Sequence, residues 1–168
     1  MKKTLIIALS CLAVLFAACK KPVEPTPEPV DYTANYIGNY LGQFTLTITS
    51  MNNQEQTGIA FPIDSIKMDI TKMEAVNAIT ATVTIENEPY QAVGTATEEK
   101  ANFEPVHLNL VRPDFSIICD ILLEGQPNAD NTLSITGSFS GSGKAIIGGA
   151  EQQFDEISGT VAGQLNKQ

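Results

Sequence analysis

The sequence contains no tryptophan and a single histidine among its 168 residues. One histidine cannot build a histidine-rich metal centre, and a Ser/His/Asp triad would have to form around His107 alone. Alternating polarity places His107 opposite Val106, Leu108 and Leu110, which predicts a solvated histidine on the outer face of a strand. The sequence therefore predicts no enzyme, and neither a bound metal nor a cofactor.

Basic residues are also scarce. The chain has 10 Lys and Arg against 19 Asp and Glu, which gives a formal net charge of −9. A nucleic-acid partner is excluded by this composition, because phosphates require clustered Lys and Arg. Neighbouring carboxylates such as Glu98 and Glu99 are interpreted as charges that keep a turn soluble, and not as the acid pair of a glycosidase.

Residues 1–18 have the layout of a secretory signal peptide. Lys2 and Lys3 form a positive start, and Leu5 to Ala18 is an uncharged apolar stretch that ends in small residues. The stretch is shorter than the about 20 residues that a membrane-spanning helix needs. A membrane anchor or a buried helix is the alternative, and the proline-rich segment that follows disfavours it.

The end of this stretch, Phe16-Ala17-Ala18-Cys19, resembles the lipobox of bacterial lipoproteins of the Bacteroidetes type. The resemblance implies cleavage before Cys19, lipidation (palmitate) of its thiol and an outer-membrane location. Several acyl chains would hold the protein in a membrane, since each buried CH₂ contributes about 0.8 kcal/mol. The membrane is thus the first expected partner.

Residues 19–33 are interpreted as a tether. Lys20 and Lys21 would lie at the lipid headgroups. Four prolines then alternate with other residues from Pro22 to Pro29, a pattern that favours an extended polyproline II spacer of roughly 25 Å. Surface-exported lipoproteins of this type resemble one another in an acidic cluster after the cysteine. Only Glu24 stands here, so a periplasm-facing position is favoured over the cell surface.

The remaining cysteines predict no disulfide. Cys11 would leave with the signal peptide and Cys19 would carry lipid, so Cys119 would be the one thiol of the mature chain. Cys119 alternates in phase with the apolar residues of Phe115–Leu123, and no histidine or positive neighbour is paired with it. We therefore expect a small buried hydrophobe rather than a nucleophile.

Apolar and polar residues alternate from Tyr36 onward, which predicts eight to ten antiparallel strands. Turn residues such as Asn52-Asn53 separate the apolar runs, and Ser65–Ala78 could hold a short helix or a loop turn. Glycines share the apolar face of three runs, which predicts sharp coiling or close backbone approach. These are Gly38, Gly42, Gly137, Gly141, Gly159 and Gly163. We predict one all-β domain at residues 34–168, a small antiparallel meander barrel of about eight strands whose first long strand pairs with its last; a two-sheet β-sandwich is the alternative.

The opening YIGNYLGQFTL, the run of hairpins and the closing DEISGTVAGQL resemble calycin-like (lipocalin-like) lipoprotein domains of Bacteroidetes bacteria. No Gly-x-Trp lipocalin signature is present, because the chain has no Trp. A barrel of this kind could bind a small apolar ligand in its interior or open end. The candidate lining residues are Tyr36, Tyr40, Phe44, Phe139 and Phe154. The alternative is an interaction or inhibitor lipoprotein that contacts a protein or glycan of the envelope.

One short motif predicts a modification. Asp64-Ser65-Ile66 resembles the sequon of Bacteroidetes O-glycosylation, which implies a glycan on Ser65. The segment Pro127–Asn131 offers oxygen atoms but lacks the spacing of an EF-hand loop, so a plain turn is predicted there.

Overall fold

A computed structural model of the chain describes residues 27–168. The predicted signal peptide (1–18), Cys19 and the first part of the tether lie outside the described residues. A short 3₁₀ helix, η1 (Thr33–Asn35), comes first and is followed by nine strands. The strands are β1 (Gly38–Met51), β2 (Gln54–Lys72), β3 (Ala78–Ile85), β4 (Glu88–Ala96), β5 (Ala101–Phe103), β6 (Val106–Val111), β7 (Phe115–Pro127), β8 (Thr132–Ile147) and β9 (Ala150–Lys167). In residues 27–168, no helix has the length and the apolar character needed to cross a membrane.

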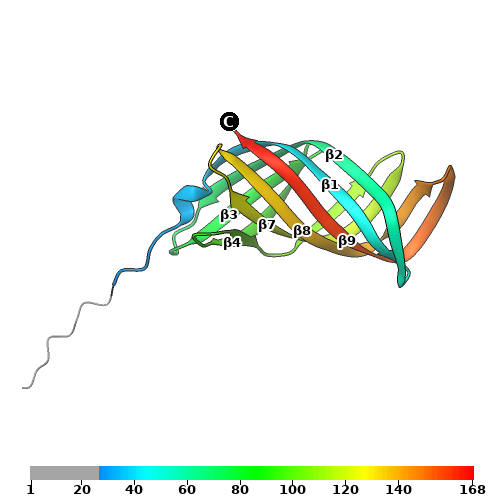
Figure 1. Ribbon diagram of the computed structural model, residues 1–168, viewed down its shortest axis with the longest axis horizontal. Helices are drawn as coiled ribbons and strands as arrows, with labels where there is room; N and C mark the ends of the chain where they lie inside the picture. The colour runs from blue at the N-terminus through cyan, green and yellow to red at the C-terminus, as the bar shows by residue number, and fades with distance from the viewer. Residues whose placement is uncertain (1–26) are drawn as a thin grey trace, which may run out of the picture.

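The nine strands form one antiparallel sheet in the order β5-β4-β3-β2-β1-β9-β8-β7-β6, and an additional β5–β7 pairing closes it into a ring (Figure 1). β1 lies between β2 and β9, so the predicted pairing of the first long strand with the last is confirmed. The fold is the predicted barrel, uneven in outline. A short helix within Ser65–Ala78 was the wrong alternative, because β2 continues to Lys72 and a loop turn follows.

The nine strands occupy only eight places around the ring, because β5 and β6 share one place. β5 and β6 both pair with the edge of β7 that β8 leaves free: Ala101 lies opposite Gly125, and Val106 lies opposite Ile121. They are two pieces of one strand, interrupted at Glu104 and Pro105. Proline has no N–H to donate to a ladder, so a break at Pro105 is expected.

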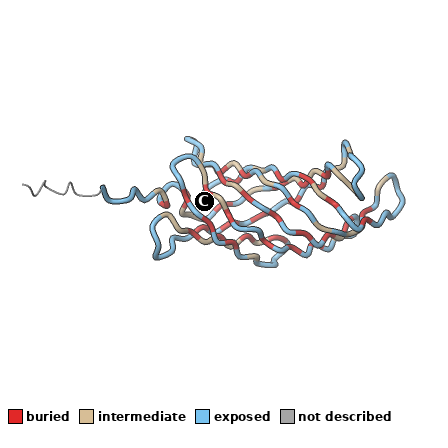
Figure 2. Tube along the Cα trace, turned by 90° about the horizontal axis from the view of Figure 1, so that it is seen from below, coloured by how far each residue is buried: buried red, intermediate tan, exposed pale blue. Residues whose placement is uncertain are grey.

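The inner face holds the core. In β3 the burial alternates strictly, with Ile79, Ala81, Val83 and Ile85 buried and the threonines between them half-exposed. Figure 2 shows the same alternation of buried and exposed residues along most of the barrel wall. Within residues 27–168, Thr33 and Thr132 are the only buried polar residues. Hydrophobic burial of one face is therefore what drives this fold.

Three hairpins turn through positive φ, as two-residue turns of this kind require: β1–β2, β3–β4 and, at Gly148 and Gly149, β8–β9. Asn52 and Asn53 have φ angles of 47° and 63°, which confirms the first predicted turn. In the β3–β4 hairpin the turn residues are Glu86 and Asn87, with φ angles of 53° and 71°. Pro89 belongs to β4 and lies opposite Thr84.

The two ends of the barrel differ. One end, called the proximal end, carries η1, the β2–β3 turn (residues 73–77) and the C-terminus (Figure 1). There the Tyr36 hydroxyl donates to the Thr97 carbonyl at 2.9 Å, and the Tyr40 hydroxyl donates to the Tyr36 carbonyl at 2.8 Å. The N-terminal segment thus closes this end. The other, distal end carries the β1–β2, β6–β7 and β8–β9 turns.

Candidate functional sites

The five aromatic residues predicted to line a ligand space lie in the core. Their side chains are at most 4% exposed. They are spread along the barrel: Tyr36 and Tyr40 at the proximal end, Phe44 against Gly163, Phe139 against Gly159, and Phe154 opposite Gly143 near the distal end. Burial raises the pKa of Tyr36 to about 12. These residues pack along the length of the interior and do not gather around one hollow.

A hollow of about 480 Å³ lies instead on the outer wall, over β1, β2 and β3. Its lining includes the exposed side chains of Leu41, Lys67 and Asp69 and the half-exposed Thr84, with Tyr40 among the buried ones. Leu41 lies opposite Lys67, and Lys67 lies opposite Thr84, so these side chains form one row across three strands. This size is within the range of small-molecule and side-chain binding sites.

The hollow joins residues of three strands and could not be predicted from the sequence. The available signal was Leu41, an apolar residue in the outward phase of a strand whose other outward positions are polar. It is 39% exposed. A single exposed leucine is ordinary on a protein surface, so the sequence alone gave no reason to single it out.

His107 is exposed on β6, as predicted. Its Nδ1 atom lies 2.9 Å from Oδ1 of Asp120, and both side chains are about two-thirds exposed, at 69% and 65%. Asp120 in turn lies opposite Ser140. The row therefore runs His, Asp, Ser, whereas a catalytic triad needs the histidine between the other two.

Cys119 is buried, and Gly141 faces it across the β7–β8 ladder. Burial, together with the nearby Asp120 carboxylate, raises the pKa of its thiol from 9.0 to about 11. The predicted small buried hydrophobe is confirmed. A thiol that keeps its proton at neutral pH is a poor nucleophile.

The Cys119 thiol is expected to weaken the fold at alkaline pH. Between pH 9 and 11 the unfolded chain loses this proton while the folded chain retains it, so the free energy of unfolding should fall by up to about 1.4 kcal/mol per pH unit. Below pH 9 both states hold the proton, and the contribution is constant. Urea midpoints across this range should decline more steeply for the wild type than for Cys119→Ala. Parallel declines would contradict the assignment.

Ser65 lies at a bulge in β2. Gly42 pairs with Ile66 and Phe44 pairs with Ile63, so two residues of β2 stand opposite one of β1. Ser65 has a φ of 59° and is exposed. Its hydroxyl is therefore accessible, and glycosylation of Ser65 stays a prediction.

The segment Pro127–Asn131 leads through a turn that is held by hydrogen bonds to the following residue, Thr132. Oδ1 of Asp130 accepts hydrogen bonds from the Thr132 hydroxyl at 2.6 Å and from the Thr132 N–H at 3.2 Å. Among the described residues, no group of three or more His, Cys, Asp or Glu side chains is placed to hold a metal ion.

Arg112 closes a gap in the wall between β2 and the β6–β7 turn. β3 pairs with β2 only from Lys67 to Lys72, so β2 extends well beyond the β3–β4 hairpin. Arg112 donates from Nη1 to the Pro62 carbonyl at 2.8 Å, forms an ion pair with Glu86, and lies 5.6 Å from the centre of the Phe115 ring. The planar guanidinium can make all three contacts at once.

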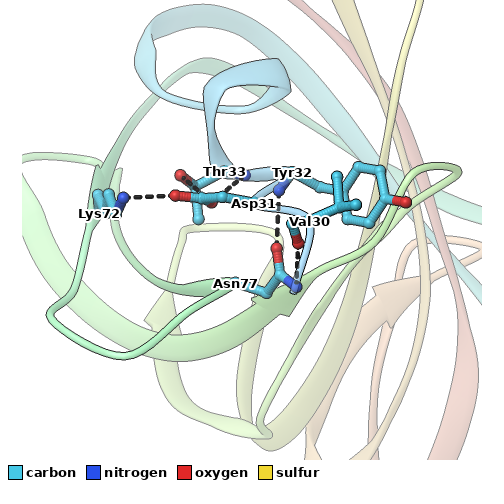
Figure 3. A network of polar contacts seen from close by, with 6 residues as sticks. All are labelled: Val30, Asp31, Tyr32, Thr33, Lys72 and Asn77. Atoms are coloured by element: carbon cyan, nitrogen blue, oxygen red, sulfur yellow. Dashed lines mark hydrogen bonds and ion pairs between the residues drawn. The ribbon is translucent and has the colours of Figure 1, made fainter. Parts of the chain in front are cut away.

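The end of the tether is held against the β2–β3 turn (Figure 3). The Asn77 amide donates to the Val30 carbonyl at 3.0 Å and accepts from the Tyr32 N–H at 2.7 Å. Asp31 forms an ion pair with Lys72. The Lys72 hydrogen bond, with those from Thr33, lowers the pKa of Asp31 to about 2. We call Val30–Thr33, together with Lys72 and Asn77, the strap clasp.

No protein-family model matches this chain, and no curated protein has significant similarity to it. The chemistry of the described side chains is then the basis for a functional conclusion.

Proposed function

We propose that this chain is a lipid-anchored, non-enzymatic β-barrel module of the cell envelope that binds a protein or glycan partner at its outer surface. The observation that carries this proposal is the contrast between the two faces of the wall. The inner face is filled by side chains such as Phe44 and Phe139, at most 3% exposed. The outer face over β1, β2 and β3 has the hollow beside Leu41.

The chemistry of that hollow suits a partner with both apolar and polar groups. Leu41 offers an apolar surface, Lys67 and Asp69 offer charges of opposite sign, and Thr84 offers a hydroxyl. Such a combination of one apolar anchor with a polar rim is typical of recognition sites on proteins. An enzyme is disfavoured because neither His107 nor Cys119 has the partners that catalysis requires.

The proposal of a lipid anchor is based on the sequence. The lipobox-like Phe16-Ala17-Ala18-Cys19 and the proline-rich segment after it support lipidation of Cys19 and attachment to the outer membrane, with the periplasm-facing side favoured. The strap clasp agrees with this arrangement, since it joins the tether to one end of the barrel.

Carriage of a small apolar ligand is the second candidate. Partly buried hydrophobic side chains pack against the core at the distal end, where no segment equivalent to η1 covers the described barrel: Met51, Ile59 and Ile147. A ligand would have to enter there, because η1 and Tyr36 close the proximal end.

The anchor predicts a clear change in fractionation. Cys19→Ser should move the protein from the membrane fraction to the soluble fraction, because no acyl chains could then hold it in the bilayer. Cys119→Ala, which removes the buried thiol, is the matched control and should stay with the membrane. Recovery of the Cys19→Ser chain in the membrane fraction would reject the anchor.

If the hollow beside Leu41 binds the partner, substitutions at two exposed leucines should affect partner binding differently. Leu41 and Leu122 are 39% and 43% exposed and lie on different parts of the outer wall. In native mass spectrometry of protein purified from its own membrane, a copurified protein or glycan should be lost in Leu41→Glu and retained in Leu122→Glu. Retention in both variants would reject the hollow as the binding surface, and a copurified apolar small molecule would support the second candidate instead.

A further inference from the structure

Residues 27–33, here called the strap, lead into the barrel, and the strap clasp fixes their backbone at two points. The amide of Asn77 contacts the carbonyl of Val30 on one side of Asp31 and the N–H of Tyr32 on the other. One amide that holds two successive peptide groups defines both the position and the direction of the strap (Figure 3). The ion pair between Asp31 and Lys72 adds a third contact on the adjacent strand.

Both partners of the clasp are themselves fixed. Asn77 has a φ of 63°, and its carbonyl accepts a hydrogen bond from the Ala96 N–H at 2.7 Å. Lys72 is the last residue of β2 and lies opposite Ile79 of β3. The strap is therefore attached to the end of one strand and to a turn that is hydrogen-bonded to β4, and not to a free loop.

The residues before the clasp are stiff. Pro27 and Pro29 are exposed, and Pro29 directly precedes Val30. Proline fixes φ near −65°, and alternating prolines favour an extended chain that keeps its direction over several residues. In Figures 1 and 2 the described strap extends beyond the proximal end, away from the barrel.

We propose that the strap clasp orients the barrel end-on to the membrane, with the proximal end toward the lipid and the β1–β2, β6–β7 and β8–β9 turns pointing away from it. This inference rests on the proposed lipid anchor at Cys19. β1 has 14 residues, and at about 3.3 Å per residue its path is roughly 45 Å long. The hollow beside Leu41 also contains Gln168 at the C-terminus, so it lies in the proximal half of the wall. A partner attached to the same membrane can therefore reach this hollow from the side.

Energy transfer to the bilayer measures this orientation. A donor dye is attached at Val76→Cys in the proximal β2–β3 turn or at Ala150→Cys at the distal β8–β9 turn; both positions are exposed. Cys119 is buried and should stay unlabelled at neutral pH. The full lipidated chain is placed in phosphatidylethanolamine–phosphatidylcholine vesicles that carry a headgroup acceptor dye. Transfer from position 76 should be several-fold more efficient than transfer from position 150.

The clasp variant is Lys72→Met combined with Asn77→Gly. Glycine tolerates the positive φ at position 77, so the turn should keep its shape while the amide is lost. In this variant the transfer efficiencies from the two positions should converge. Lys144→Met, which removes the exposed ion pair between Lys144 and Glu151 at the distal end, is the control and should keep the wild-type difference. Thermal unfolding of each variant confirms that the barrel is intact.

The possible outcomes distinguish a failure of the proposed anchor from a failure of the proposed orientation. If the wild-type chain does not float with the vesicles, the proposed anchor is rejected, and this inference with it. If the chain floats but transfer is equal from both positions, the end-on orientation alone is rejected. A wild-type difference that the clasp variant leaves unchanged would show that the clasp is not its cause, which also overturns the inference.

Discussion

Gly141→Ala is expected to destabilise the barrel by about 3 kcal/mol or more, because overpacking against backbone is relieved only by moving a strand. A Cβ atom at position 141 would lie 2.0 Å from the Ile118 carbonyl oxygen and 2.6 Å from the Cα atom of Cys119. Both contacts are with the neighbouring strand β7, whose own pairing with β8 fixes its place. Urea unfolding of the purified domain measures the loss.

Gly125→Ala is the matched control for this prediction. Gly125 also lies in a strand and is buried, but a Cβ there would only approach Leu133 and Ile135, at 3.4 to 3.5 Å. Replacing this glycine reduces the entropy of the unfolded chain, so the variant should be neutral or more stable by up to about 1 kcal/mol. Equal destabilisation by the two substitutions would show that close approach of β7 and β8 is not what position 141 requires.

Phe44→Ala is expected to lower the free energy of unfolding by about 3–5 kcal/mol. The ring is 1% exposed and covers Gly163, where a Cβ atom would lie 2.6 Å from its Cδ1 atom. Removal leaves a cavity between β1 and β9, the pair that joins the first strand to the last. Loss of that packing should be visible in both chemical and thermal unfolding.

The same substitution distinguishes core packing from ligand contact. Leu122→Ala, at a 43% exposed position on the outer face, should change stability by less than about 0.5 kcal/mol. If Phe44→Ala were similarly mild and instead released a bound small molecule, position 44 would line a ligand space, and carriage would replace surface binding as the function.

The inward-facing glycines show which structural features the local sequence pattern can predict. The predicted close backbone approach is confirmed at Gly141 and Gly163, whose absent Cβ atoms would meet neighbouring strands. The alternation of Tyr40, Phe44 and Leu46 likewise predicted which face is buried, and it is. Both features are indicated by the alternation of residues along one strand, so one sequence is sufficient to predict them.

The candidate site was harder to predict from the sequence than the fold was. The five aromatic residues were correctly placed on the inner face, but their distribution along the barrel depends on strand registers, which shift at bulges such as the one between Gly42 and Phe44. The row of Leu41, Lys67 and Thr84 joins positions on three strands and needs those same registers. No local period encodes such an alignment.

The sequence by itself determined the all-β character, the inward face of strands such as β1 and β3, the Asn52-Asn53 turn and the expectation of a lipid on Cys19, because each is carried by residues close together in the chain. The tertiary structure decided how β5 and β6 close the ring. It also decided that Arg112 binds the Pro62 carbonyl and that Asn77 forms hydrogen bonds with Val30 and Tyr32 of the strap. The hydrogen bonds of Arg112 and Asn77 join residues more than forty positions apart, and only the closed sheet brings them together.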